Sequence, residues 1–215
     1  MNSLIIDCSN GMAVYVICDK GTFSFVDQNQ KRHTDELLVS VDKLLSEAGL
    51  LVGDVQNICI CIGPGSFTGI RVAISICKGL AVSGDVKVVC ASNFDVLSYG
   101  HSENAYYLLD GFSEYIYVRK FENGAYFDSC ERLSDFISMA KLNADFVVYT
   151  NSEKLQNKLI EAKIIYKNVE NNIISCFKDK IANFKFTPIN EISPIYLRAS
   201  QAEIEREKKM SGNNE

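Results

Sequence analysis

Short apolar runs alternate with turn-forming residues along the first ninety positions. Runs such as Leu4-Ile5-Ile6 are typical of buried strands, and Ser9-Asn10-Gly11 is typical of a turn. Apolar residues then recur at helical spacing between Thr34, a suitable N-cap, and Gly49, a suitable stop. The pattern predicts the order β-β-β-α-β-α-β, with strands at 4–7, 12–17, 22–26, 57–62 and 86–90 and helices at 34–48 and about 69–82.

The same order returns in the second half of the chain. Its first predicted strand also ends in an aspartate, Asp110, and Asn123-Gly124 predicts a hairpin turn. The pattern predicts strands at 106–109, 114–121, from 125, 146–149 and 164–169, and helices at 133–140, 152–162 and 173–182. A last element at 199–209 is mostly polar.

A duplicated α/β order with an aspartate closing each first strand favours the two-lobed actin-like ATPase fold, whose lobes are ribonuclease H-like. We expect an N-terminal lobe at 1–102, a smaller C-terminal lobe at 103–190, and a C-terminal helix and tail at 191–215. In that architecture the two aspartates, here Asp7 and Asp110, flank the phosphates of a nucleotide and their Mg²⁺. The alternative is that both only cap turns, where aspartate is common.

Composition places the chain among ordinary globular proteins. It has 215 residues, of which 47% are hydrophobic and 23% charged, and its net charge is −5. Nucleic-acid-binding domains usually carry a basic face, whereas the densest basic stretch here, residues 205–209, also holds two glutamates. We therefore expect that this chain does not bind RNA directly by itself. Since it shows no signal peptide and no run of about 18 apolar residues, we expect a cytoplasmic protein without membrane contact.

The eight cysteines offer one weak candidate for a metal site. Cys59 and Cys61 lie two apart in a predicted strand and so face the same side, but the sequence has no CxxC pair. Its two histidines, His33 and His101, are not near these cysteines in sequence. Small buried thiols in a reducing compartment are the favoured interpretation, so we expect no metal and no cofactor.

The stretch GPGSFTGIR, residues 63–71, joins a predicted buried strand to a predicted helix, where backbone N–H groups often bind phosphate. Its residues argue against that use. Five residues separate Gly63 from Gly69 and no lysine follows, so the stretch is not a P-loop. Thr68 stands where a dinucleotide fingerprint has its third glycine.

Structural roles are predicted for this loop instead. Ser66 or Thr68 can cap the following helix, and Gly65 and Gly69 are predicted to hold a turn with positive φ. Ser66 has no histidine close by in sequence, so we expect no catalytic residue here. The loop residues singled out are Gly63, Pro64, Gly65, Ser66, Phe67, Thr68 and Gly69.

The helix after the loop is apolar on more than one side. The face predicted to meet the sheet comprises Ile70, Ala73, Ile74, Cys77, Leu80 and Ala81. A second stripe is also apolar or small, and it comprises Val72, Ile76, Gly79 and Ser83. A helix that is apolar on most sides is buried on most sides, so in a lobe this small we predict a second chain on that stripe. The alternative is further packing within its own core.

The string GPGSFTGIRVAISICKGLA, with IIDCS near the start, resembles the TsaB (YeaZ) family of bacterial tRNA threonylcarbamoyladenosine biosynthesis proteins. Arg32-His33-Thr34-Asp35, the stretch from Asp110 to Tyr117, and PIYLR at 194–198 extend the resemblance. It is dense over residues 1–92 and patchy afterwards. Gly111-Phe112 departs from the family pattern.

The resemblance implies a non-catalytic subunit. In this family the larger paralogue TsaD carries the metal-binding histidines and transfers the threonylcarbamoyl group to adenosine 37 of tRNAs that read ANN codons. The TsaB-like chain binds and activates TsaD, and the pair recruits the ATPase TsaE, so tRNA is reached only through the complex. Alone, such a chain is expected to form a homodimer through the same face. The partner-binding residues implied are Thr34, Leu38, Arg71, Val72, Ile76 and Gly79, and those of a vestigial nucleotide cleft are Asp7, Ser9 and Asp110.

Two other functions stay open on the sequence. One is an active ATPase or small-molecule kinase of the actin-like fold that uses Asp7 and Asp110. The other is a glycoprotease-like hydrolase, although no nucleophile–base set in the sequence supports it.

Overall fold

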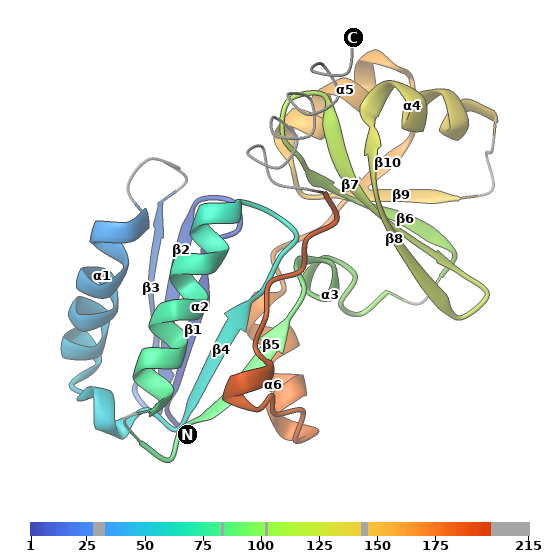
Figure 1. The fold of residues 1–215 in the computed structure, drawn as a ribbon. Helices are drawn as coiled ribbons and strands as arrows, with labels where there is room; N and C mark the ends of the chain where they lie inside the picture. The colour runs from blue at the N-terminus through green and yellow to red at the C-terminus, as the bar shows by residue number, and fades with distance from the viewer. Residues whose placement is uncertain (28–32, 83, 102, 143–145, 199–215) are drawn as a thin grey trace, which may run out of the picture.

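Two lobes follow one another along the chain, and each is built on a five-stranded sheet (Figure 1). The computed structural model describes residues 1–27, 33–82, 84–101, 103–142 and 146–198, the side chains of residues 33–35 excepted. The element predicted at 199–209, Arg32 and Ser83 lie outside these residues.

The N-terminal sheet has the strand order β3-β2-β1-β4-β5. Its strands are β1 (Ser3–Asp7), β2 (Met12–Cys18), β3 (Gly21–Asp27), β4 (Asn57–Cys61) and β5 (Lys87–Ala91). β1 pairs antiparallel with β2, to which a short turn joins it, and parallel with β4, which the chain reaches through a helix. Gly11 supplies the positive φ, +88°, of the β1–β2 turn.

Helices cover both faces of this sheet: on one face α1 (His33–Ala48) and α2 (Phe67–Val82), and on the other α6 (Ile173–Ala182). Both faces are therefore apolar, which explains the continuous hydrophobic run in β1. Successive side chains of a strand point to opposite faces. Leu4 and Ile6 belong to the core under α1 and α2, and Ile5 belongs to the core under α6.

The C-terminal sheet repeats this topology. Read from its β8 edge, the strand order β8-β7-β6-β9-β10 corresponds position for position to β3-β2-β1-β4-β5. Its strands are β6 (Ala105–Asp110), β7 (Tyr115–Glu122), β8 (Ala125–Arg132), β9 (Val147–Thr150) and β10 (Tyr166–Asn168), and α4 (Leu133–Leu142) and α5 (Glu153–Glu161) cover one face. The predicted two-lobed fold, with the order β-β-β-α-β-α-β in each lobe, is confirmed.

A short helix at the junction of the lobes, α3 (Asn93–Leu97), was not predicted (Figure 1). Its Phe94 and Leu97 belong to one buried cluster with Tyr107 and Tyr149 of the C-terminal sheet. The two lobes therefore share a small apolar core at α3.

An ionic network also joins the lobes at this point. Arg119 of β7, which is 8% exposed, donates to both carboxylate oxygens of Asp128 at 2.7 and 2.8 Å, and to Asp95 of α3 at 2.9 Å. Lys180 of α6 reaches the other oxygen of Asp95 at 3.2 Å. Burial alone would raise the pKa of Asp95, but the hydrogen bond from Arg119 and the charge of Lys180 outweigh it and lower that pKa to about 2.

The structure shifts several predicted boundaries. α1 begins at His33, so Thr34 lies in the first turn of the helix instead of at its N-cap. α2 begins at Phe67, earlier than the predicted residue 69, and the strand predicted at 164–169 is reduced to β10. α6 precedes the lobe boundary predicted at residue 190, yet it packs on the N-terminal sheet. The domain boundaries themselves stay a prediction.

Candidate functional site

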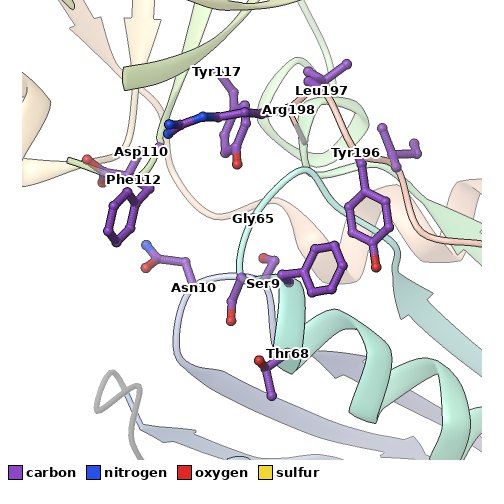
Figure 2. A pocket seen from close by; sticks show the side chains of 14 residues that line it. Ser9, Asn10, Gly65, Thr68, Asp110, Phe112, Tyr117, Tyr196, Leu197 and Arg198 are labelled. Carbon is purple, nitrogen blue, oxygen red and sulfur yellow. The ribbon is translucent and has the colours of Figure 1, made fainter. Parts of the chain in front are cut away.

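A pocket of about 300 Å³ lies between the lobes, where the first turns of the two sheets face each other (Figure 2). The N-terminal lobe contributes the β1–β2 turn and the loop before α2, and the C-terminal lobe contributes the β6–β7 turn. Residues 195–198, which follow α6 in the chain, close one side. The polar side chains in the lining include Ser9, Asn10, Thr68, Asp110 and Arg198.

Two glycines, Gly65 in the loop before α2 and Gly69 in the first turn of α2, allow two chain segments to approach closely. A Cβ on Gly65 would lie 2.5 Å from the carbonyl oxygen of Ser9, and a Cβ on Gly69 would overlap the carbonyl oxygen of Cys8. Within this loop only Gly63 has a positive φ, at +108°. The positive φ predicted at Gly65 and Gly69 is therefore wrong. Glycine is needed there because the β1–β2 turn passes directly over the loop.

Ser66 caps α2, as predicted. Its hydroxyl accepts a hydrogen bond from the N–H of Gly69 at 3.2 Å, and its own N–H donates to the carbonyl of Ser9 at 2.7 Å. A phosphate at the N-terminus of a helix is bound by such N–H groups. Since those of Ser66 and Gly69 are engaged within the chain, the loop has fewer donors for an anion than its position suggested.

Asp7, at the end of β1, interacts with its own turn. One of its carboxylate oxygens accepts from the N–H of Ser9 at 2.9 Å and from the hydroxyl of Ser9 at 2.6 Å. Burial raises the pKa of Asp7, and these hydrogen bonds act against that rise. Asp7 is not among the residues that line the pocket. Its contacts are those of a turn-capping aspartate.

Asp110, at the end of β6, does line the pocket (Figure 2). Its side chain is 22% exposed, and the ammonium nitrogen of Lys154 lies 3.7 Å from its Oδ1. That oxygen is buried and accepts no hydrogen bond from any residue that the structure describes. Of the three residues predicted for a nucleotide cleft, the pocket thus brings together Ser9 and Asp110.

Arg71, the last residue of the GPGSFTGIR stretch, belongs to an aromatic stack. The rings of Phe67 and Tyr196 are stacked with their centroids 4.5 Å apart, and the guanidinium carbon of Arg71 lies 3.9 Å from the centroid of Phe67. Arg71 Nε donates to the hydroxyl of Tyr196 at 2.7 Å. The partner-binding role of Arg71 stays a prediction, and its contact with a residue 125 positions away was not predicted.

The second apolar stripe of α2 is partly covered by its own lobe. The predicted sheet-facing residues Ile70, Ala73, Ile74, Cys77 and Ala81 are buried, and Leu80 is half-buried. Val72 and Ile76 are half-buried and pack against the same core, so packing within the lobe accounts for part of the stripe. Gly79 is exposed, with no atom within 4 Å of where a Cβ would lie.

On α1, Leu38 is 51% exposed. The side chain of Thr34 lies outside the described part of the chain. We call Leu38, Val72, Ile76 and Gly79 the α1–α2 surface; that this surface binds a partner stays a prediction.

The cysteines whose side chains are described are free thiols. Burial raises the pKa of Cys8 and of Cys77 to about 12, so both stay protonated at neutral pH. Cys59 and Cys61 are buried, and among the described residues no group of three or more His, Cys, Asp or Glu side chains could hold a metal ion. Within the same part of the chain, no helix has both the length and the apolar character that a membrane span requires.

Several residues of the pocket wall were not predicted as site residues, and Phe112 and Arg198 are two of them. Phe112, which is 66% exposed, extends from the β6–β7 turn, and Arg198 comes from the segment after α6 (Figure 2). Both had a signal in the sequence. Phe112 lies in the dipeptide that departs from the family pattern, and Arg198 ends the PIYLR stretch.

Comparisons with known proteins agree with the fold. A family model described as TsaD, tRNA N6-adenosine threonylcarbamoyltransferase, matches residues 27–202. The solved structure of YeaZ from Pseudomonas aeruginosa superposes with a TM-score of 0.68 at 20% identity, covering 91% of this chain and 99% of that one. A structure described as an uncharacterized protein similar to peptidase YEAZ, also from Pseudomonas aeruginosa, gives a TM-score of 0.69 at 20% identity. Likeness at this identity shows the fold.

Curated relatives match one segment of the chain. The tRNA threonylcarbamoyladenosine biosynthesis protein TsaB of Haemophilus influenzae is 31% identical over 96 residues, which are 44% of this chain and 41% of that protein. The TsaB of Bacillus subtilis is 28% identical over 100 residues, 46% of this chain and 44% of that protein. The matched segments thus span less than half the length of these relatives.

Proposed function

The chain belongs to the TsaD family, whose model matches residues 27–202, and from this premise we propose that it acts in the formation of threonylcarbamoyladenosine in tRNA. Within that process its sequence resembles TsaB and its fold resembles YeaZ. We therefore assign it the role of a non-catalytic subunit that binds and activates TsaD, which modifies adenosine 37 of tRNAs that read ANN codons. The family match is the observation that carries the proposal.

The residues of the interlobe pocket support a non-catalytic role for the chain. Phosphoryl transfer relies on positioned cations and on carboxylates that hold Mg²⁺. Here Asp7 accepts hydrogen bonds from Ser9, and among the described residues the pocket lining contains one basic side chain, Arg198, together with Asp110. This arrangement counts against the alternative of an active ATPase or small-molecule kinase.

The α1–α2 surface supports a protein partner. Leu38 is 51% exposed and the next residue, Val39, is 66% exposed. Apolar side chains gathered on a surface often mark an interface, and burying a leucine fully contributes about 1.5–3 kcal/mol. Gly79 has open space in front of it, so another backbone can approach closely there. We propose that TsaD docks on this surface in the cytoplasm, and that without TsaD a second copy of the chain does so.

The remaining partners follow from this assignment. TsaE is proposed to join the pair of subunits, and tRNA is proposed to reach the chain only through the complex. The net charge of −5 supports this, because a chain that held RNA by itself would be expected to carry a basic face.

Association with TsaD from the same organism tests the proposal, measured by calorimetry with purified chains. Leu38→Arg places a charge on the α1–α2 surface and should weaken association by about tenfold or more, equivalent to at least about 1.4 kcal/mol. Leu142→Arg is the matched control, because Leu142 is 90% exposed on α4 of the other lobe. It should bind as the unchanged protein does.

Two results would contradict the proposal. Absence of association between the unchanged chains would exclude a TsaB role, whereas equal affinities of the two arginine variants would exclude only the assigned surface. A titration with ATP and Mg²⁺ addresses the alternative function, because micromolar binding with measurable turnover would favour the ATPase.

A further inference from the structure

A segment after α6 crosses from the N-terminal lobe to the C-terminal lobe (Figure 1). We call residues 194–198, with the sequence PIYLR, the strap. At its start the N–H of Ile195 donates to the carbonyl of Ile62 at 2.7 Å, just beyond the end of β4. The carbonyl oxygen of Ile195 lies 2.7 Å from where a Cβ of Gly63 would be. The backbone of the strap is thus fitted against the loop that leads into α2.

The middle of the strap holds the first turn of α2. Tyr196 stacks on Phe67, and its hydroxyl accepts the hydrogen bond from Arg71 Nε, while the guanidinium of Arg71 covers the other partner of the stack, Phe67. Figure 2 shows Tyr196 standing beside the loop before α2. An offset aromatic pair and a cation on an aromatic ring both stabilise a contact beyond the area that they bury. The start of α2 is therefore held by side chains as well as by its own cap.

The end of the strap holds the other lobe. Leu197 packs against the buried cluster that the lobes share at α3. The guanidinium carbon of Arg198 lies 4.1 Å from the centroid of the Tyr115 ring, at the start of β7. Consecutive side chains of one extended segment thus contact α2, the shared core and the C-terminal sheet.

From these contacts we propose that the strap is a conformational device that locks the first turn of α2 to the C-terminal lobe, and that Tyr196 is its anchoring residue. Among the residues that the structure describes, the lobes are also tied by the apolar cluster at α3 and by the Arg119 network, and both contact α3 or α6. Neither includes a residue of α2 among those described. Without Tyr196, the loop and the first turn of α2 lose their side-chain tie to the second lobe while the lobes stay joined at α3.

The lock has a consequence for the pocket, because the strap and the first turn of α2 form adjacent parts of one wall. Ile195, Tyr196 and Arg198 line the pocket together with Phe67 and Thr68. Release of Tyr196 would therefore widen the pocket and loosen the start of α2 in one movement. This inference does not rest on the identity of any partner, so it can fail or stand independently of the function proposed above.

Amide hydrogen exchange, followed by mass spectrometry on the whole chain, tests the lock. Two amides at the start of α2 would show release of the lock. The N–H of Gly69 donates to the hydroxyl of Ser66, and the N–H of Ile70 donates to the carbonyl of Ser66. Local opening sets the exchange rate of such amides. Tyr196→Ala should accelerate their exchange by about tenfold, with little change in peptides from β6 and β7.

Two variants separate the lock from a general effect of removing an aromatic ring. Tyr196→Phe keeps the stack and should accelerate exchange by less than about threefold. Phe184→Ala is the matched control, because Phe184 lies between α6 and the strap, is 78% exposed and contacts Phe186. It should leave the start of α2 unchanged.

Unchanged exchange at Gly69 and Ile70 in folded Tyr196→Ala overturns the proposal. If that variant unfolds instead, exchange will rise in every peptide, and Arg71→Gln then decides. Arg71 is exposed, so replacing it removes part of the stack without disturbing a core. Acceleration confined to the start of α2 in Arg71→Gln supports the lock, and wild-type exchange in that variant refutes it.

Discussion

Alanine should have opposite effects at the two glycines inside α2. At Gly79 no atom lies within 4 Å of an added Cβ, so alanine gains helix propensity and should stabilise the protein by about 0.5–1 kcal/mol. At Gly69 the added Cβ would overlap the carbonyl oxygen of Cys8. The backbone fixes the position of the Cβ, and the oxygen that it meets is a backbone atom, so either α2 or the β1–β2 turn must shift. Such overpacking costs about 1–3 kcal/mol and outweighs the propensity gain of about 1 kcal/mol.

Urea unfolding followed by circular dichroism measures both effects. Because the two variants carry the same substitution in the same helix, changes in the unfolded chain largely cancel between them. We expect Gly69→Ala to be less stable than Gly79→Ala by about 2 kcal/mol, with equal denaturant slopes. A shift of α2 should also lengthen the hydrogen bond between the Gly69 N–H and Ser66, now 3.2 Å. Stability of Gly69→Ala equal to or above that of the unchanged protein would show that the contact with Cys8 is relieved at no cost, and the account of this loop would be wrong.

Three further predictions concern the partner surface, the first aspartate and acid stability. Gly79→Ala should bind TsaD about tenfold more weakly in calorimetry despite its higher stability, since a methyl group would block close approach; unchanged affinity would remove Gly79 from the interface. Asp7→Asn should reduce threonylcarbamoylation by the reconstituted complex only as far as it reduces TsaD binding, and a hundredfold loss with TsaD still bound would favour the ATPase alternative. The folded pKa of Asp95, about 2, lies below its ordinary 3.8, so its contribution to stability is present above pH 3.8 and is lost as the pH falls toward 2. Asp95→Asn should therefore show a flatter fall of the urea midpoint over that range, and identical pH profiles would contradict the assignment.

Most of the fold could be predicted because the sequence of each lobe shows the periodicity and the turn residues that are typical of its helices and strands. The short apolar run of β2 and the helical spacing in α1 and α2 depend on neighbours within one element, which a sequence shows directly. α3 was missed because it has five residues, too few for a periodic pattern. Its signal was a cap: Ser92 accepts from the N–H of Asp95, whose carboxylate accepts from the N–H of Ser92.

The site was less accessible to sequence reasoning because its contacts join distant parts of the chain. The absence of a lysine from the loop at 63–71 was visible, and it led to a structural interpretation of the loop. The reason for two of its glycines was not visible, because the carbonyl groups that approach them belong to Cys8 and Ser9 in another turn. In the same way, Arg71 and Tyr196 lie 125 positions apart. Contacts of this kind can be identified only when the three-dimensional arrangement of the lobes is known.

The two lobes repeat one topology, but their first turns differ in a way that bears on function. Asp7 is followed two positions later by Ser9, whose N–H and hydroxyl both donate to it. Asp110 occupies the equivalent place in the second lobe, but the residue two positions later is Phe112, which has no hydroxyl to donate. The first carboxylate is therefore held in its own turn, and the second keeps an oxygen without a hydrogen bond from the described residues.

This asymmetry argues against a shared metal between the lobes. A clamp that holds Mg²⁺ between two carboxylates needs both of them turned toward the ion, and Mg²⁺ demands near-ideal octahedral geometry. Turning Asp7 into the pocket would break two hydrogen bonds of 2.9 and 2.6 Å and leave the Ser9 hydroxyl to find another acceptor. A ligand in the pocket would instead meet one carboxylate, Asp110, opposite the aromatic wall of Phe67 and Tyr196. The two lobes thus share one scaffold, but of their two first-turn aspartates only Asp110 lines the pocket, so the pair of carboxylates that such metal binding requires is not brought together there.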